Sequence, residues 1–161
     1  MVEFAPLAGI TYDMSDDELL KMFEDLTLPF AHWTHRAHVK VAHLYLRAHP
    51  FDEALLRMRR GIIAYNARNK VPESATSGYN ETTTRAFLHL IAATMSAYGQ
   101  AMPTENADQF CDTHPQLMTR NVLRLFYSPQ QRMHPLAKSQ FVEPDLGPLP
   151  GIRGASGSQH K

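Results

Sequence analysis

The spacing of apolar residues constrains this chain more than any other feature, because they recur every three to four positions in one segment after another. Such spacing is typical of helices that bury one face. Ser15 and Glu18 open the first of these segments in the form of a capping box. No segment alternates apolar and polar residues for long enough to predict a strand. We therefore expect an all-α fold, a single-domain helical bundle of about five to seven helices.

Capping residues and prolines mark where the expected helices begin and end. Thr34 and Asp52 have the chemistry of N-caps, and Ser128 is followed by proline at the first helical position. These signals predict helices over residues 16–28, 34–48, 52–69, 79–98, 104–113 and 116–127, and a short turn after residue 128. Three parts are expected: an extended N-terminal arm (residues 1–14), the helical domain (15–142) and a disordered Pro- and Gly-rich tail (143–161).

Composition and charge exclude several classes of protein. The chain has 161 residues and a formal net charge of zero, so it lacks the basic excess that nucleic-acid binding usually requires. It contains neither an apolar run of about 18 residues, as a membrane helix needs, nor the features of a secretory signal at its start. Its single cysteine, Cys111, cannot form an internal disulfide. We therefore expect a cytoplasmic protein without a nucleic-acid or membrane partner, and a homodimer stays open.

The chain has nine histidines, and two of them share one face of the expected helix 34–48. At about 100° per residue, the charged side chains of that helix lie roughly 100–140° from His35 and define its expected solvent face: Arg36, Lys40 and Arg47. His43 falls at about 80°, beside these charges, and is expected to be exposed. His38 falls at about 300°, so His35 and His38 are neighbours at i, i+3 and face inward.

Two imidazole rings on an inward face need partners, because a buried polar group without one costs about 1–3 kcal/mol. Three roles stay open for His35 and His38: hydrogen bonding to other side chains, joint binding of a metal ion, or acid–base catalysis. The i, i+3 spacing lets both rings reach one ion, and neutral imidazole is a common metal ligand.

A second group of inward polar residues is expected at the start of helix 79–98. Asn80 and Thr84 fall on its apolar face, whereas Glu81, at about 100° from Asn80, lies on the boundary. The first turn of a helix also offers unpaired backbone N–H groups that favour an anion. Simpler alternatives are that Asn80 only caps the helix and that Glu81 pairs with Arg85 on the surface. One pocket between two helices is thus expected to be lined by polar side chains from both: His35, His38, Asn80, Thr84 and Glu81.

Several sequence blocks resemble those of a widespread bacterial family of short helical proteins. The blocks are an aromatic-x-His-Arg-x-His run at residues 33–38, a Tyr-Asn-Glu-Thr run at 79–82, and a Tyr-Ser-Pro segment at 127–129 with a closing Phe-x-x-Pro-Asp at 141–145. The family is largely uncharacterised. The resemblance, which covers most of residues 30–145, therefore implies a fold and a candidate site but no reaction.

The resemblance also implies a metal site. His35, His38 and Glu81 match the family's polar positions, and histidines with a carboxylate would suit one divalent ion of iron, copper, zinc or nickel. Asn80 departs from the family pattern, which usually has a histidine there, and asparagine is a much poorer ligand for these ions. Three outcomes stay open: the metal is lost, it is bound more weakly, or an acid–base site is kept instead.

These observations predict a small enzyme that acts on a small organic molecule. His35, His38 and Glu81 are its expected catalytic residues or metal ligands, in a metal-dependent reaction of the oxygenase or lyase type or in acid–base chemistry. Two alternatives are a non-catalytic helical binding or accessory module and a family member whose metal site has degenerated. The residues expected to bind the substrate are Tyr79, Asn80 and Thr84.

Overall fold

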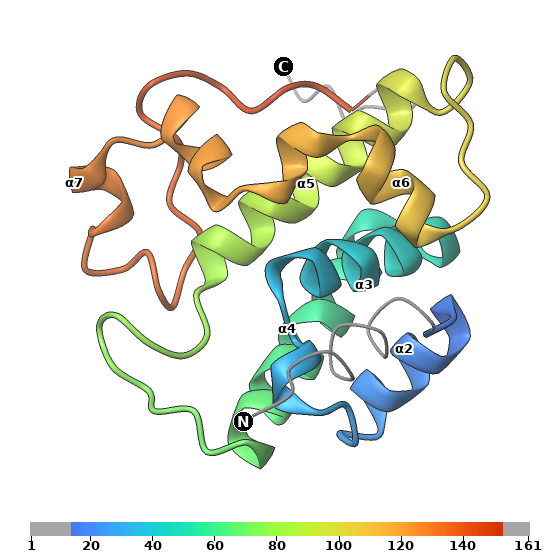
Figure 1. Ribbon diagram of the computed structural model, residues 1–161. Helices are drawn as coiled ribbons and strands as arrows, with labels where there is room; N and C mark the ends of the chain where they lie inside the picture. Colours follow the sequence, from blue (N-terminus) through green and yellow to red (C-terminus); the bar gives the residue numbers. More distant parts are fainter. Residues whose placement is uncertain (1–13, 153–161) are drawn as a thin grey trace, which may run out of the picture.

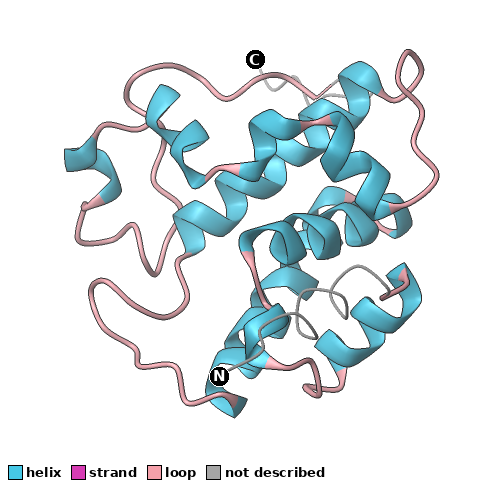
Figure 2. Cartoon of the chain, in the orientation of Figure 1, coloured by secondary structure: helices cyan, strands magenta, loops and turns pink. Residues whose placement is uncertain are grey.

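The computed structural model describes residues 14–152, and every regular element in that range is a helix (Figure 1, Figure 2). The α-helices are α2 (Asp16–Glu24), α3 (His35–Ala48), α4 (Phe51–Arg68), α5 (Glu81–Tyr98), α6 (Ala107–Thr113) and α7 (Pro129–Arg132). Three short 3-10 helices lie between them: η1 (Phe30–His32), η2 (Pro115–Met118) and η3 (Arg120–Leu125). Within this described range no helix has both the length and the apolar character that a membrane span requires. The prediction of an all-α, single-domain fold is confirmed.

Four helices begin directly after a residue that the sequence marks as a candidate N-cap and whose side chain caps the helix. The expected cap at Asp52 is wrong, because α4 begins at Phe51 behind Pro50, which has no side-chain hydrogen bond to offer. The expected helix 116–127 is also wrong, because the extended backbone of Thr119 divides it into η2 and η3. The four residues accept a hydrogen bond from the backbone N–H three positions ahead, and they are Ser15, Thr34, Asn80 and Ser128. Asn106 caps α6 in the same way, although it is not among the predicted caps.

Helix α3 lies at the centre of the molecule and contacts α2, α4, α5 and α6 (Figure 1). Aromatic rings fill the space where α2 and α4 meet the start of α3. The ring centroids of Phe23 and Trp33 are 4.6 Å apart, and Tyr65 contacts both rings. The buried Tyr65 hydroxyl donates a hydrogen bond of 2.8 Å to the carbonyl of Leu28, so its polar end is satisfied. This packing fixes Trp33 next to the first turn of α3.

Gly61 allows α2 to approach α4 closely. A Cβ atom at this position would lie 2.5 Å from the Phe23 ring, which is closer than real side chains pack. Gly61→Ala is therefore expected to lower the free energy of unfolding by about 1–3 kcal/mol, even though alanine favours the helix by about 1 kcal/mol. Urea unfolding would measure the change. In a Phe23→Leu background the same substitution should cost less, and an equal cost would show that the ring is not the obstacle.

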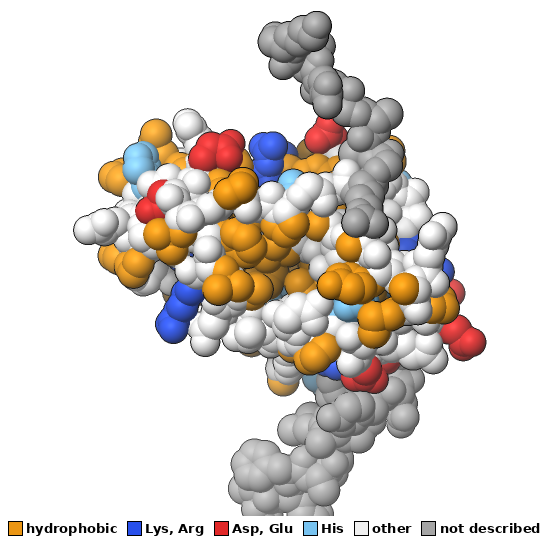
Figure 3. All heavy atoms as spheres, turned by 90° about the horizontal axis from the view of Figure 1, so that it is seen from above, with side chains coloured by type: hydrophobic (Ala, Val, Ile, Leu, Met, Phe, Trp, Pro, Cys, Tyr) orange, Lys and Arg blue, Asp and Glu red, His pale blue; other side chains and the backbone are white. Residues whose placement is uncertain are grey.

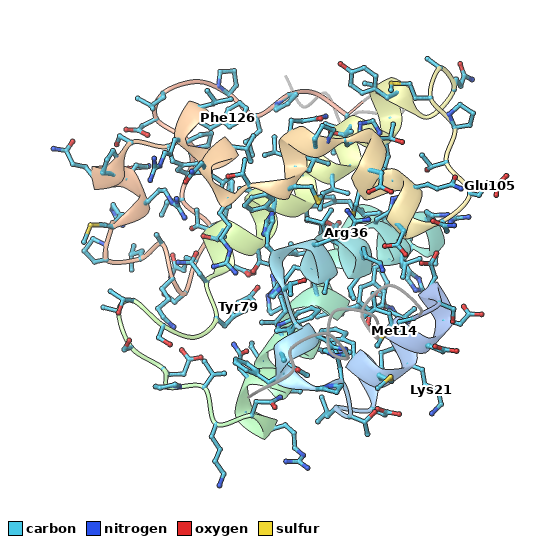
Figure 4. The ribbon with its side chains drawn as sticks, in the orientation of Figure 1. Met14, Lys21, Arg36, Tyr79, Glu105 and Phe126 are labelled. Atoms are coloured by element: carbon cyan, nitrogen blue, oxygen red, sulfur yellow. The ribbon has the colours of Figure 1, made fainter. Side chains whose placement is uncertain are left out.

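The face of α3 that the sequence assigns to solvent is covered by α6, and Arg36 lies between the two helices (Figure 4). Lys40 is only 5% exposed and its Nζ lies 2.9 Å from Asp108, which also pairs with Arg36. His43 is buried as well, and its ring stacks on Phe110 with 4.0 Å between centroids. The expectation of exposure is wrong for Lys40 and His43, because α6 brings an acidic partner for the cation and an aromatic ring for the histidine. Arg47, near the end of α3, is exposed as expected.

The last described stretch, residues 143–152, lies along the helical domain instead of forming a disordered tail (Figure 1). Ser128 donates hydrogen bonds from its N–H and its hydroxyl to the Asp145 carboxylate. The expectation of disorder is wrong here, since a Pro- and Gly-rich segment can still find polar partners on a folded surface. Residues 153–161 of the expected tail and 1–13 of the expected arm lie outside the described part of the chain.

Candidate functional site

A cavity of about 410 Å³ lies between α3, α4 and α5, a size typical of sites for small organic molecules. Five of the six residues expected at the site line this cavity, whereas Glu81 does not. Apolar side chains form much of its wall: Phe30, Trp33, Val39, Ala42, Met58, Ile62, Val71, Phe87, Leu88 and Ile91. Its polar side chains come from both helices and from later segments: His35, His38, Asn66, Thr76, Tyr79, Asn80, Thr83, Thr84, Arg120 and Arg132.

His38 lies in the first turn of α3, and its ring stacks on Trp33 with 3.7 Å between centroids. Its Nδ1 lies 2.7 Å from the carbonyl oxygen of Thr34, the residue that caps the same helix. A carbonyl oxygen only accepts hydrogen bonds, so Nδ1 carries the proton and Nε2, at the far end of the ring, keeps its lone pair. Burial lowers the pKa of His38 to about 4, so the ring is neutral at pH 7.

His35 is oriented in a similar way by a different part of the chain. Its Nε2 donates a hydrogen bond of 2.8 Å to the carbonyl of Leu117 in η2, and its ring meets Phe87 of α5 edge-on. Nδ1 therefore keeps the lone pair. Burial lowers the pKa of His35, so this imidazole is also neutral at pH 7. Each histidine thus has one basic nitrogen in a defined tautomer.

The first turn of α5 brings Asn80 and Thr84 to the cavity, but no free N–H groups. Asn80 caps the helix, and it also lines the cavity. The first two N–H groups of the helix donate to the backbone carbonyls of residues 138 and 137, at 2.9 and 3.1 Å. The expectation of unpaired N–H groups for an anion is therefore wrong, because a later segment of the chain already uses them.

Glu81 is buried, and its carboxylate is engaged by partners other than the two histidines. Arg59 of α4 donates to it through Nε, at 2.7 Å, and through Nη2, and the Tyr79 hydroxyl donates at 2.8 Å. Burial opposes the charged form, but Arg59 and Tyr79 outweigh it and hold the pKa of Glu81 below its usual value. The alternative pairing with Arg85 is not seen either, since that guanidinium lies over the Phe141 ring.

Glu81→Gln is expected to lower the free energy of unfolding by about 1–3 kcal/mol, because it removes the charge that satisfies Arg59. Glu53→Gln is the matched control. Glu53 pairs with Arg57 at 3.0 Å on the surface, and losing such a pair costs at most about 1 kcal/mol. Urea unfolding of both variants at pH 7 measures the difference. Equally small effects would show that the pair of Glu81 with Arg59 does not support the fold.

The donors around the cavity suit proton transfer better than they suit a divalent metal. Among residues 14–152 no group of three or more His, Cys, Asp or Glu side chains could hold an ion. The cavity itself offers the bare nitrogens of His35 and His38 and the amide of Asn80, which is a weak ligand. Cys111 does not line it, and burial raises the pKa of this thiol to about 11.

Tyr79 lies on the inner side of the loop that precedes α5 (Figure 4), and its hydroxyl is bound to Glu81. Burial and that carboxylate raise the pKa of Tyr79 well above its usual value, so the hydroxyl stays protonated. His32, which precedes the other two histidines by three and six positions, is buried in η1 and does not line the cavity. The histidine pair of the site is therefore limited to His35 and His38.

Two arginines line the cavity although nothing in the sequence marks them as site residues. Arg120 begins η3 and Arg132 ends α7, far along the chain from the two histidines. No motif or helical spacing relates them to the site, and only the fold brings them to the cavity. Trp33 could have been singled out, because it is the aromatic residue of the aromatic-x-His-Arg-x-His block.

Comparisons with known proteins do not identify the chain. No model of a known family, no curated protein and no solved structure matches it. The role of the cavity must therefore be inferred from its geometry and its chemistry.

Proposed function

We propose that this chain is a small enzyme that binds a small organic molecule in the cavity and moves a proton to or from it. His38 serves as the base, His35 serves as the acid once its bare Nδ1 has taken up a proton from solvent, and Tyr79, Asn80 and Thr84 contact the substrate. The proposal rests on one observation. Two neutral imidazoles line one cavity, and each has one ring nitrogen fixed by a backbone carbonyl and the other without a partner among residues 14–152.

An oriented, neutral imidazole meets the requirements of general acid–base catalysis. Its bare nitrogen takes up a proton, while an acceptor on the second nitrogen orients the ring and stabilises its charged form. The carbonyls of Thr34 and Leu117 are such acceptors. We assign the role of base to His38, because its ring is held both by a hydrogen bond and by stacking on Trp33.

The simplest reaction for such a pair is removal of a proton from carbon next to a carbonyl group. The C–H bond breaks, its electron pair passes into the carbonyl to give an enolate, and the proton moves to Nε2 of His38. Return of a proton to carbon completes an exchange or an isomerisation. If a leaving group departs from the adjacent carbon with its bonding pair, the same step gives an elimination, so the class includes lyases.

Hydrogen exchange with solvent tests the proposal without knowledge of the natural substrate. The full chain, purified without a histidine tag, is incubated in D₂O with a panel of small ketones and keto acids, and loss of the C–H signal is followed by proton NMR. We expect at least one compound to exchange faster than in buffer and to change the fluorescence of Trp33, the single tryptophan of the chain. Binding without exchange would support a non-catalytic binding module instead. If no compound binds and none exchanges its hydrogen, the proposal is overturned.

A metal-dependent form of the proposal uses the same two nitrogens. Nδ1 of His35 and Nε2 of His38 would be ligands of a divalent iron, copper, zinc or nickel ion, with Asn80 in place of a third imidazole. Metal analysis of the tag-free chain decides between the two forms. The metal-dependent form would be favoured if one metal ion per chain is found, if its removal lowers Tm, and if adding it back restores Tm. Its absence, with no change in Tm on adding these ions, would favour acid–base chemistry.

A further inference from the structure

Two arginines line the cavity without an acidic partner. Arg120 is exposed and Arg132 is half-buried. Neither side chain forms an ion pair or a hydrogen bond with another residue between 14 and 152, and no Asp or Glu lines the cavity. The carboxylate of Glu81, in the first turn of α5, is already held by Arg59. Two positive charges in this cavity are therefore not neutralised by the chain itself.

Arg120 lies close enough to the two histidines for its charge to act on both. After burial and the carbonyl partner of each ring, this charge contributes to the lowered pKa values of His35 and His38. Arg120 is exposed, so water accepts its hydrogen bonds in the free protein. An anionic group on the ligand would take the place of this water and add a charge-assisted hydrogen bond.

The wall of the cavity sets a second requirement for the ligand. Trp33 of the loop before α3 and Phe87 of α5 contribute aromatic surface, and other apolar side chains from α3, α4 and α5 surround them. A small ion alone would leave most of a cavity of about 410 Å³ unfilled. The fitting ligand therefore combines an apolar body with one charged end.

We propose that the cavity binds an organic oxyanion, with an apolar body against Trp33 and Phe87 and a carboxylate or phosphate group paired with Arg120 and Arg132. A guanidinium suits both groups, because it donates two parallel hydrogen bonds to two oxygens. This inference rests on the proposed function, since it names the substrate class of the same cavity.

The overall charge of the chain would not attract an anionic ligand to the cavity. The chain has 16 Lys and Arg against 16 Asp and Glu, and on the face that Figure 3 shows the charged side chains are scattered and not grouped by sign. Preference for an anion would therefore depend on the two arginines at the cavity. This dependence makes the inference testable by single substitutions.

Four matched probes test the head group of the ligand: phenylacetate, phenyl phosphate, phenylacetamide and 2-phenylethylamine. They share an aromatic body and differ in charge. Their binding to the full chain is measured by Trp33 fluorescence and by the shift of Tm. We expect an anionic probe to bind at least about tenfold more tightly than the amide, and the amine to bind least. The order of phenylacetate and phenyl phosphate identifies which oxyanion is preferred.

Arg120→Gln is expected to weaken binding of the preferred anion by about tenfold or more and to leave the affinity for the amide unchanged. Arg124→Gln is the control, because Arg124 is an exposed arginine on the same 3-10 helix and does not line the cavity. Arg120→Glu should move the preference towards the amine.

Equal affinities for phenylacetate and phenylacetamide would overturn the oxyanion assignment. Unchanged affinity for the anion in both Arg120→Gln and Arg132→Gln would overturn it as well. In either case the cavity would remain a binding site of another specificity. If none of the four probes binds, the oxyanion assignment also fails, and the D₂O panel then decides separately whether the proposed function stands.

Discussion

Acidification from pH 7 to pH 4 is expected to lower the free energy of unfolding by about 3 kcal/mol through His43 alone. His43 is 4% exposed, stacks on Phe110, and has no hydrogen-bond partner at either ring nitrogen within the described residues. Burial, followed by the charges of Arg47 and His114, lowers the pKa of His43 from 6.5 to about 4. The folded chain therefore resists a proton that the unfolded chain accepts.

The sign of the effect follows from which state binds this proton more readily. Between pH 6.5 and about pH 4 the histidine is protonated in the unfolded chain but neutral in the folded chain. Stability is therefore unaffected by His43 above about pH 6.5 and falls as the pH drops through this window. Below about pH 4 both states hold the proton, so His43 adds no further loss.

His43→Phe should remove this part of the pH dependence. Phenylalanine keeps a ring against Phe110 and leaves no buried nitrogen unsatisfied, so the variant is also expected to gain about 1–3 kcal/mol at pH 7. Urea unfolding at pH 7, 6, 5 and 4 gives the free energy of unfolding of both proteins. Because both carry the same carboxylates, the difference between their pH curves isolates His43. A variant curve parallel to that of the natural chain would contradict the assignment.

Features that depend on a single helix could be predicted from the sequence. Ser15 and Thr34 cap their helices because their side chains reach a backbone N–H three residues ahead, a contact that needs no other part of the chain. The common inward face of His35 and His38 follows equally from the turn of one helix. Both rings line the cavity for this reason.

Contacts between distant segments could not be predicted in this way. A helical wheel gives the angle of Lys40 on α3, but it does not show that α6 brings Asp108 to that side chain. Glu81 is bound by Arg59, which lies 22 positions away on another helix. Arg120 reaches the cavity only through the path of the chain after α6. Tertiary packing decides such partners, and local spacing carries no information about them.

His38→Gln is expected to slow the exchange reaction by about 100-fold or more, the usual loss when a general base is removed. Glutamine has a similar length and can still donate a hydrogen bond to the carbonyl of Thr34, but its amide has no basic nitrogen. Proton transfer should be lost while the cavity stays formed. His35→Gln should slow the reaction as well, because it removes the partner acid.

His49→Gln is the matched control, since His49 follows α3 and does not line the cavity. Exchange is compared by proton NMR, and binding of the same compound is compared by Trp33 fluorescence. We expect binding to persist in all three variants and exchange to persist only in the control. Full exchange in His38→Gln would contradict its role as base, and loss of binding together with exchange would indicate a role in shaping the cavity.

The pH profile distinguishes a base from a residue that only supports the structure. A base whose pKa in the free protein is about 4 should keep kcat/KM level from pH 8 down to about pH 5 and let it fall at lower pH. Acid unfolding driven by His43 would distort this profile over the same range. The measurement therefore belongs in the His43→Phe variant, whose substitution lies outside the cavity. If the rate there follows the free energy of unfolding at each pH, His38 supports the structure and does not carry the proton.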